Sequence, residues 1–305
     1  MALLACDLGG TSIKLGIVRE GEVVARASLP SGAGAGLGAR LPAIADRWRS
    51  MTAGESLEGI SVAFPSIVDP SGRITSDIGK YPDAMGLDLK EWARAEFGLP
   101  LAIDNDARMA AIGEWRYGAG KGYDDLVMVT LGTGIGTSVI IEGKVLRGRH
   151  GQAGCLGGHL VLRYDGHPCS CGSIGCAEAE ASTSVLHRMA RDEADCGGST
   201  LVPPLDYEKV FHEAAQGDPC AASLRDRSIR AWSALAVSLI HAYDPEVIVV
   251  GGGVANAGDW LLRSIQEYTD RHAWTPWGKV RVLRSRLGDD AALVAGEWLF
   301  QERQG

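Results

Sequence analysis

Short apolar stretches separated by glycine turns mark the start of the chain. Residues 2–7 and 13–18 are mostly apolar, and the polar turn Asp7-Leu8-Gly9-Gly10-Thr11 separates them. A second turn at Glu20-Gly21 precedes the apolar residues 23–27. Apolar runs of this length bounded by glycine are typical of strands, so the pattern predicts a three-stranded meander.

Further along, apolar runs and helical periodicity alternate. Buried strands are expected at residues 59–63, 100–104, 247–250 and 280–284. Helices are expected at residues 37–50, 89–97, 107–117, 184–193, 207–216, 220–243, 259–271 and 289–301. Alternating strands and helices indicate an α/β fold.

A second glycine turn repeats the layout of the first. The expected strands 126–131 and 137–141 flank Gly132-Thr133-Gly134-Ile135-Gly136. Two copies of strand, glycine turn and strand favour internal duplication. We expect a small domain of residues 1–117, a larger domain of residues 118–288, and a C-terminal helix of about residues 289–305 that packs back on the small domain.

Composition limits the classes of function. With 305 residues the chain is long enough for two domains, each with its own core. The share of hydrophobic residues, 46%, is typical of soluble globular proteins. The net charge is −8 and no basic cluster occurs, which argues against a nucleic-acid partner. The N-terminal apolar run is too short for a signal peptide or membrane helix, so we expect a cytoplasmic protein with no membrane partner.

Cysteine and histidine gather in one short segment. Cys169, Cys171 and Cys176 fall within eight residues, and His159 and His167 lie upstream. Thiolates and imidazoles at this density are typical of a structural zinc site, and the alternative is three unligated thiols. Seven cysteines form an odd total, and together with the expected absence of a signal peptide this points to a reducing compartment, which disfavours a disulfide explanation of the group.

Both glycine turns could be ordinary hairpins, but they also suit phosphate binding. Glycines let backbone N–H groups approach phosphate oxygens, a threonine hydroxyl can donate to them, and a nearby aspartate can hold Mg²⁺. A third turn, Gly251-Gly252-Gly253, follows an apolar strand and could accept an adenosine. No Walker sequence occurs, and nothing in the chain matches a nicotinamide fingerprint in the right place.

Taken in order, these motifs resemble the ROK family of sugar kinases and related repressors. The resembling motifs are Asp7-Leu8-Gly9-Gly10-Thr11, Asn105-Asp106, Gly132-Thr133-Gly134, the loop from His159 to Glu178, and Val250-Gly251-Gly252-Gly253. The resemblance implies a two-domain actin-like, hexokinase-type fold, duplicated and ribonuclease H-like, with an interdomain cleft. It also implies ATP, Mg²⁺ and Zn²⁺, a sugar substrate and a homodimer. The family's repressors carry a helix-turn-helix before the first glycine turn, for which six residues leave no room.

The resemblance assigns roles to individual residues. Asp106 would be the general base, with a helix N-cap as its alternative role; Asn105, Asp106, His159 and Glu178 would bind the sugar, and Glu178 could instead be a solvated charge at a helix start. His159, Cys169, Cys171 and Cys176 would hold zinc, with His159 preferred to His167. ATP would contact Asp7, which also holds magnesium, together with Gly9, Gly10, Thr11, Lys14, Gly132, Thr133, Gly134, Gly252 and Gly253.

Two departures from the family pattern fall on the sugar side. The family's glutamate before Gly-His is absent, and either Leu156 or Cys155 takes its place. Residues 75–81 lack the family's Pro-Asn segment. A lost acceptor for a buried hydroxyl costs about 1 to 3 kcal/mol. The alternatives are therefore a kinase for a non-glucose sugar, an amino sugar or a polyol, or a sugar-responsive binding protein without transfer activity.

Overall fold

The computed structural model describes residues 2–32, 34–52, 54, 56–76, 80–193, 196 and 199–304, and the chain divides into two compact units. Unit 1 comprises Met1–Gly122, Val145–Ala153 and Leu287–Gly305, and unit 2 comprises Tyr123–Lys144 and Gly154–Arg286. The sequence-based division had not placed Val145–Ala153 with the N-terminal residues.

Unit 1 is built on a five-stranded sheet with the order β3-β2-β1-β4-β5. β1 pairs antiparallel with β2, which pairs antiparallel with β3, whereas β4 and β5 run parallel to β1. The strands are β1 (Ala2–Leu8), β2 (Ser12–Arg19), β3 (Glu22–Pro30), β4 (Gly59–Phe64) and β5 (Leu101–Asn105). Parallel strands buried on both faces read as continuous apolar runs, which is why β1 and β4 could be predicted closely.

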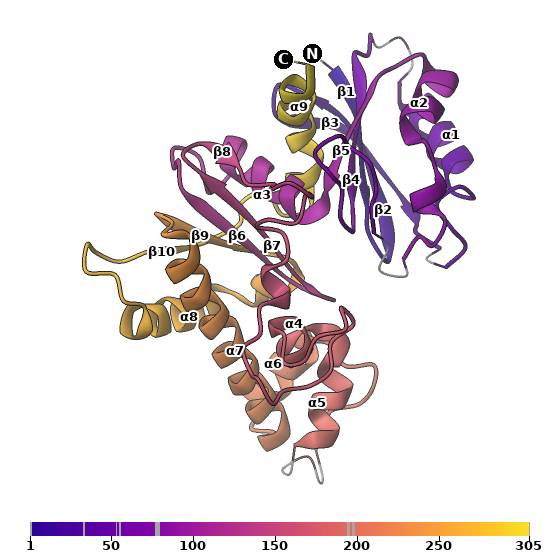
Figure 1. The fold of residues 1–305 in the computed structure, drawn as a ribbon. Helices are drawn as coiled ribbons and strands as arrows, with labels where there is room; N and C mark the ends of the chain where they lie inside the picture. Colours follow the sequence, from indigo (N-terminus) through magenta and orange to yellow (C-terminus); the bar gives the residue numbers. More distant parts are fainter. Residues whose placement is uncertain are drawn as a thin grey trace. The chain divides into compact units, whose positions relative to one another are not determined.

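Helices cover both faces of this sheet (Figure 1). On one face, α1 (Leu41–Met51) and α2 (Leu89–Phe97) bury Trp48 and Ala93 in the largest core. On the other, α3 (Asp106–Tyr117) and α9 (Ala291–Gln304) pack together. Gly113 allows their close approach, because a Cβ there would collide with the Ala291 carbonyl. A 3-10 turn, η1 (Ala84–Gly86), precedes α2.

Unit 2 repeats the topology of unit 1. Its sheet has the order β8-β7-β6-β9-β10, with β6 and β7 antiparallel and β6, β9 and β10 parallel. The strands are β6 (Leu126–Leu131), β7 (Ile135–Ile141), β8 (Lys144–Val145), β9 (Val247–Gly251) and β10 (Arg281–Arg284). The same order around two glycine hairpins confirms the predicted α/β class and its duplication.

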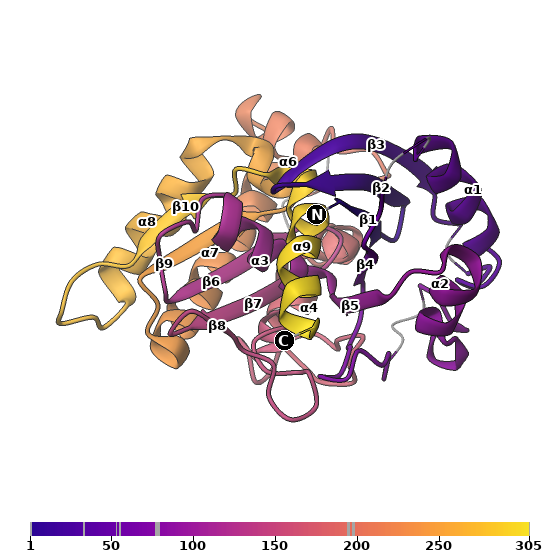
Figure 2. The ribbon, with the colours of Figure 1, turned by 90° about the horizontal axis from the view of Figure 1, so that it is seen from above.

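The helices of unit 2 follow the loop that contains Cys169, Cys171 and Cys176. They are α4 (Ala177–Ala181), α5 (Leu186–Asp192), α6 (Tyr207–Ala215), α7 (Pro219–Tyr243) and α8 (Asp259–His272), with 3-10 turns η2 (Gly157–His159), η3 (Thr183–Val185), η5 (Gly253–Ala257) and, in unit 1, η6 (Gly288–Asp290). α8 lies beside α7 and β10 (Figure 2). Within the described part of the chain, no helix combines the length and apolar character needed to cross a membrane.

Two local features differ from the expectation. The helix expected from residue 37 begins at Leu41, because the Asp83 carboxylate accepts hydrogen bonds from Leu37 N (2.6 Å) and Gly38 N (2.9 Å) and holds these residues outside the helix. Cys196 and Cys220 form a disulfide, with their Cα atoms 4.6 Å apart. This pair differs from the expectation of a reducing compartment, in which disulfides are rare.

Candidate active site

The first glycine turn of unit 1 joins β1 to β2. A Cβ at Gly9 would lie 2.6 Å from the Ser12 carbonyl oxygen, so the turn needs glycine at this position. The turn is held from outside, since Ser31 Oγ donates to Gly10 O (2.6 Å) and Tyr81 Oη donates to Gly9 O (3.0 Å). The exposed Thr11 hydroxyl and the backbone of this rigid turn are therefore available to a phosphate.

Asp7 and Lys14 face each other across this hairpin. Lys14 Nζ lies 3.6 Å from the Asp7 carboxylate and 2.7 Å from that of Asp289. Burial raises the pKa of Asp7 to about 6, Lys14 opposes the rise, and the charge of Asp106 adds to it. A buried carboxylate that is only partly neutralised attracts a cation, which suits magnesium.

Asn105 and Asp106 lie where β5 passes into α3. Asn105 is the N-cap, and its Oδ1 accepts from Arg108 N (3.0 Å). Its Nδ2 donates to Ser66 O (3.1 Å) and Asp106 Oδ1 (3.0 Å). Both amide hydrogens are thereby used, and one lone pair of Oδ1 is left. Asn105 takes the capping role that was the alternative explanation for Asp106.

Hydrogen bonds fix the Asp106 carboxylate in place, and these bonds come from uncharged donors. Its Oδ1 accepts from Ala107 N at 2.7 Å and from Asn105 Nδ2. Burial raises the pKa of Asp106, and the Lys80 ammonium is the strongest opposing influence. Lys80 also lies against the first glycine turn, with its Cε 3.2 Å from where a Gly10 Cβ would stand. Residues 77–79, part of the segment that departs from the family, lie outside the described residues.

A buried ionic network supports this junction, and the sequence analysis missed it. Asp104 and Arg108 are fully buried and form an ion pair. Asp104 also accepts from Asn105 N (2.8 Å) and from Arg147 Nε (3.1 Å), and Arg108 Nη2 donates to Gly151 O (2.9 Å). The Asp-x-x-x-Arg spacing at the start of a helix was the available signal, because residues four apart share a helix face.

In unit 2 the second glycine turn joins β6 to β7. Gly132 N donates to Gly134 O (3.0 Å), and Thr183 N donates to Gly132 O (2.9 Å). Gly252, with φ +83°, packs against this turn so closely that a Cβ would collide with the Leu131 carbonyl. The structure therefore places Gly252 beside the end of β6, and Thr133 remains exposed.

Glu178 also contacts the second glycine turn. Its Oε2 accepts a hydrogen bond from Ile135 N at 2.9 Å, and a Cβ at Gly134 would lie 2.5 Å from the same oxygen. Its Oε1 has a long contact of 3.5 Å with Ser170 Oγ. Glu178 is therefore not a freely solvated charge, and Oε1 retains capacity to accept from a ligand.

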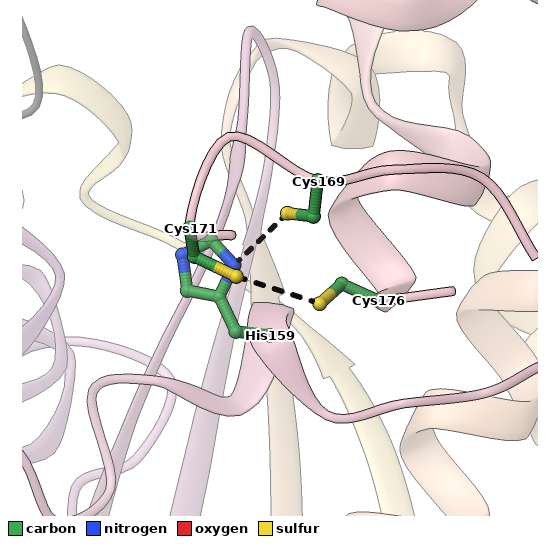
Figure 3. A group of neighbouring side chains, drawn as sticks. All are labelled: His159, Cys169, Cys171 and Cys176. Atoms are coloured by element: carbon green, nitrogen blue, oxygen red, sulfur yellow. Dashed lines mark hydrogen bonds between the residues drawn. The ribbon is translucent and has the colours of Figure 1, made fainter. Parts of the chain in front are cut away.

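His159 and three cysteines converge in unit 2 (Figure 3). Cys169 Sγ lies 3.5 Å from His159 Nδ1, Cys171 Sγ lies 3.7 Å from Cys176 Sγ, and all four ligand atoms lie within 4.8 Å of one another. Tetrahedral zinc with bonds of about 2.0 to 2.3 Å separates its ligand atoms by about 3.3 to 3.8 Å, so this donor set fits zinc.

His167 lies outside this cluster. Its Nδ1 is 3.0 Å from Glu180 Oε1, its Nε2 is 3.0 Å from Asp192 Oδ2, and its backbone N–H donates to Glu180. Glu180 is buried and also binds Arg227 (3.2 Å). His167 and Glu180 thus fasten the cysteine loop to α4, a contact the sequence did not reveal.

The two residues that could take the place of the missing family glutamate differ in burial. Cys155 is buried at 9% exposure, whereas Leu156 is 36% exposed and precedes η2. Glycine is needed beyond it, since a Cβ at Gly158 would collide with the Ile135 carbonyl. Of the two candidates, Leu156 is the side chain that a ligand could reach.

The chain matches the ROK family over residues 3–303. It belongs to this family. It is 31% identical to a glucokinase of Thermotoga maritima, covering 100% of this chain and 99% of that protein, and 31% identical to an N-acetylmannosamine kinase of Yersinia pestis, covering 86% of each. A Streptomyces griseus ROK glucokinase in complex with glucose and AMPPNP superposes with a TM-score of 0.85, 31% identity and complete coverage of both chains.

These similarities confirm the predicted ROK membership and the hexokinase-type, actin-like fold of the ROK kinases. The protein is an ATP-dependent sugar kinase. Which sugar it prefers is a separate question, because relatives of similar identity carry the names of different kinases.

Proposed function

We propose that this ROK kinase transfers the γ-phosphoryl group of ATP to a sugar hydroxyl with Asp106 as general base. The observation that carries the proposal is that Asn105 and Asp106 have different roles at the start of α3. Asn105 caps the helix and orients Asp106 Oδ1, while Asp106 Oδ2 keeps its acceptor capacity. A base whose pKa is raised by burial takes a proton more readily than an ordinary aspartate.

In this proposal the two glycine turns bind the ATP phosphates. Gly9, Gly10 and Thr11 supply donors in the first turn, and Gly132, Thr133 and Gly134 supply them in the second. Lys14 adds a positive charge, and Gly252 and Gly253 accept the adenosine. Asp7 would hold Mg²⁺, which neutralises phosphate charge in phosphoryl transfer.

Asp106 then accepts the proton of the attacking hydroxyl as the new P–O bond forms and ADP leaves. Asn105 acts mainly as a positioning residue, with one Oδ1 lone pair left for the sugar. Glu178 Oε1 and His159 Nε2 complete the proposed sugar contacts, since Nδ1 is the nitrogen that faces the cysteines.

Zinc, held by His159, Cys169, Cys171 and Cys176, would be structural. Four protein ligands leave no open coordination position. The cluster fixes the loop between η2 and α4, which carries His159 at one end and Glu178 at the other. This is how the metal would shape the sugar site.

A non-glucose sugar is the favoured substrate. Either Leu156 or Cys155 takes the place of the family's carboxylate, and Leu156 is the exposed one of the two, so a sugar hydroxyl that donates to that carboxylate would have no acceptor there. A homodimer and a cytoplasmic location remain predictions from the family resemblance and the sequence.

The experiment that tests the proposal measures ADP release with ATP and Mg²⁺ over a panel of hexoses, amino sugars and polyols. Sugar-dependent ADP release is expected for at least one of them. Sugar binding by calorimetry without ADP release on any member would instead support the binding-protein alternative.

A further inference from the structure

The outer edge of the unit 1 sheet carries a basic cavity whose described lining residues include none of the first glycine turn. It has a volume of about 300 Å³, and its basic lining residues are Lys90, Arg94 and Arg303. β5, the last strand of the sheet, forms its floor through residues that include Ala102 and Ile103. The cations come from two helices, α2 and α9, that cover opposite faces of the sheet.

The charges in this cavity repel one another. Lys90 and Arg94 are four residues apart on α2, an arrangement of like charges that destabilises a helix. Glu91 relieves part of this, at 2.7 Å from Arg94 Nη1, but no aspartate or glutamate is among the described residues that line the cavity. The chain has 38 acidic and 30 basic residues, so three cations without a lining acid are not a consequence of composition.

Arg303 provides a second, independent observation. Its Nη2 atom is buried and has no hydrogen-bond partner among the described residues. Burial lowers the pKa of Arg303, with Asp104 acting in the opposite direction. A buried guanidinium donor without a partner costs free energy, so the protein does not fully compensate the charge of Arg303.

The shape of the cavity also favours a small ligand. Gly72, with φ +81°, keeps it open, since a Cβ there would lie 3.3 Å from Lys90 Nζ and 3.4 Å from Ile103. Guanidinium groups present paired donors that match phosphate oxygens, and lysine adds a compact charge. We propose that the basic cavity binds a small phosphorylated anion, either a phosphate monoester or inorganic diphosphate.

Calorimetric titration of the full chain with sodium diphosphate, and separately with a hexose phosphate, tests this proposal. Arg94→Gln and Arg303→Gln are each expected to weaken binding of the tighter probe at least fivefold. Arg47→Gln, an exposed charge on α1, is the matched control and should change affinity less than twofold. The probe that binds more tightly shows whether the cavity prefers a phosphate monoester or inorganic diphosphate.

Lys14→Gln separates this cavity from the glycine turn. Binding that is lost in Lys14→Gln and kept in both arginine variants would overturn the proposal, as would equal losses in Arg47→Gln or no binding of either probe. Arg94 is exposed, so its variant tests the proposal even if Arg303→Gln reduces stability, which thermal unfolding without ligand would report. The result does not depend on turnover, so it stands apart from the proposed catalytic roles.

Discussion

Glu178 accepts a hydrogen bond from the backbone N–H of Ile135, 43 residues earlier in the chain, at 2.9 Å. Glu178 lies two residues after Cys176, the last cysteine of the loop, and Ile135 belongs to the second glycine turn and begins β7. One carboxylate therefore joins a residue group predicted to bind sugar to a turn predicted to bind phosphate.

Replacing Glu178 should consequently affect both substrates. We expect Glu178→Ala to raise KM for ATP as well as for the sugar and to lower kcat/KM about tenfold or more, because a charge-assisted bond of about 1.5 to 3 kcal/mol is lost. Glu178→Gln keeps an acceptor for Ile135 N and should retain the KM for ATP. Steady-state kinetics with each substrate varied would contradict the prediction if only the sugar KM changed in Glu178→Ala.

Removing a zinc ligand should loosen the loop that positions Glu178 against Ile135. Cys171→Ser is expected to reduce zinc content well below one per chain and to lower the thermal unfolding temperature, since a serine hydroxyl is a poor zinc ligand. Metal analysis and thermal unfolding provide the measurements. Cys155→Ser, at a thiol outside the cluster, is the control and should retain its zinc. Unchanged stability and sugar affinity in Cys171→Ser would argue against a structural metal.

Asp7 should make the free protein less stable at neutral pH. Its pKa is raised by burial from about 3.8 to about 6, so the stability linked to it is present below about pH 4 and is lost as the pH rises through 6. Asp7→Asn avoids this loss, so its free energy of unfolding is expected to exceed that of wild type by about 3 kcal/mol at pH 7.5, with a smaller difference at pH 4.5. Urea unfolding without Mg²⁺ or ATP measures it, and equal pH dependence in both proteins would contradict it.

Much of the fold could be predicted from local patterns. The apolar runs at β1, β4 and β9 are buried on both faces, and glycine turns mark the two hairpins, so strands and duplication follow from short stretches of sequence. α2 was predicted to the residue because Asp88 caps it and Gly98 ends it in the left-handed conformation.

The features that could not be predicted depend on contacts between residues far apart in the sequence. The sequence places Asp104 four residues before Arg108, but Arg147 and Gly151 reach the same network only after folding. The disulfide of Cys196 with Cys220 and the contact of Glu178 with Ile135 are likewise long-range. Leu37 was placed in a helix because the competing acceptor, Asp83, lies 46 residues away.

The sugar preference follows from the exposed Leu156. We expect glucose to have less than a tenfold advantage in kcat/KM over every other sugar, which corresponds to about 1.4 kcal/mol of transition-state discrimination. Leu156→Glu should raise kcat/KM for glucose, and Leu160→Glu, at a leucine of equal exposure, should not. A tenfold or greater glucose preference in the wild type would show that another acceptor, such as Glu178 or a water molecule, replaces the missing carboxylate.

Asp106→Asn tests the central claim most directly. The amide keeps the shape of the side chain and can still accept from Ala107 N, but it cannot take a proton from the sugar hydroxyl. ADP release with the preferred sugar should fall below about one per cent of wild type, consistent with a base contributing about 10²-fold to 10⁴-fold, while calorimetric sugar affinity stays within a few-fold. Turnover above one per cent with unchanged sugar affinity would contradict the assignment of Asp106 as the general base.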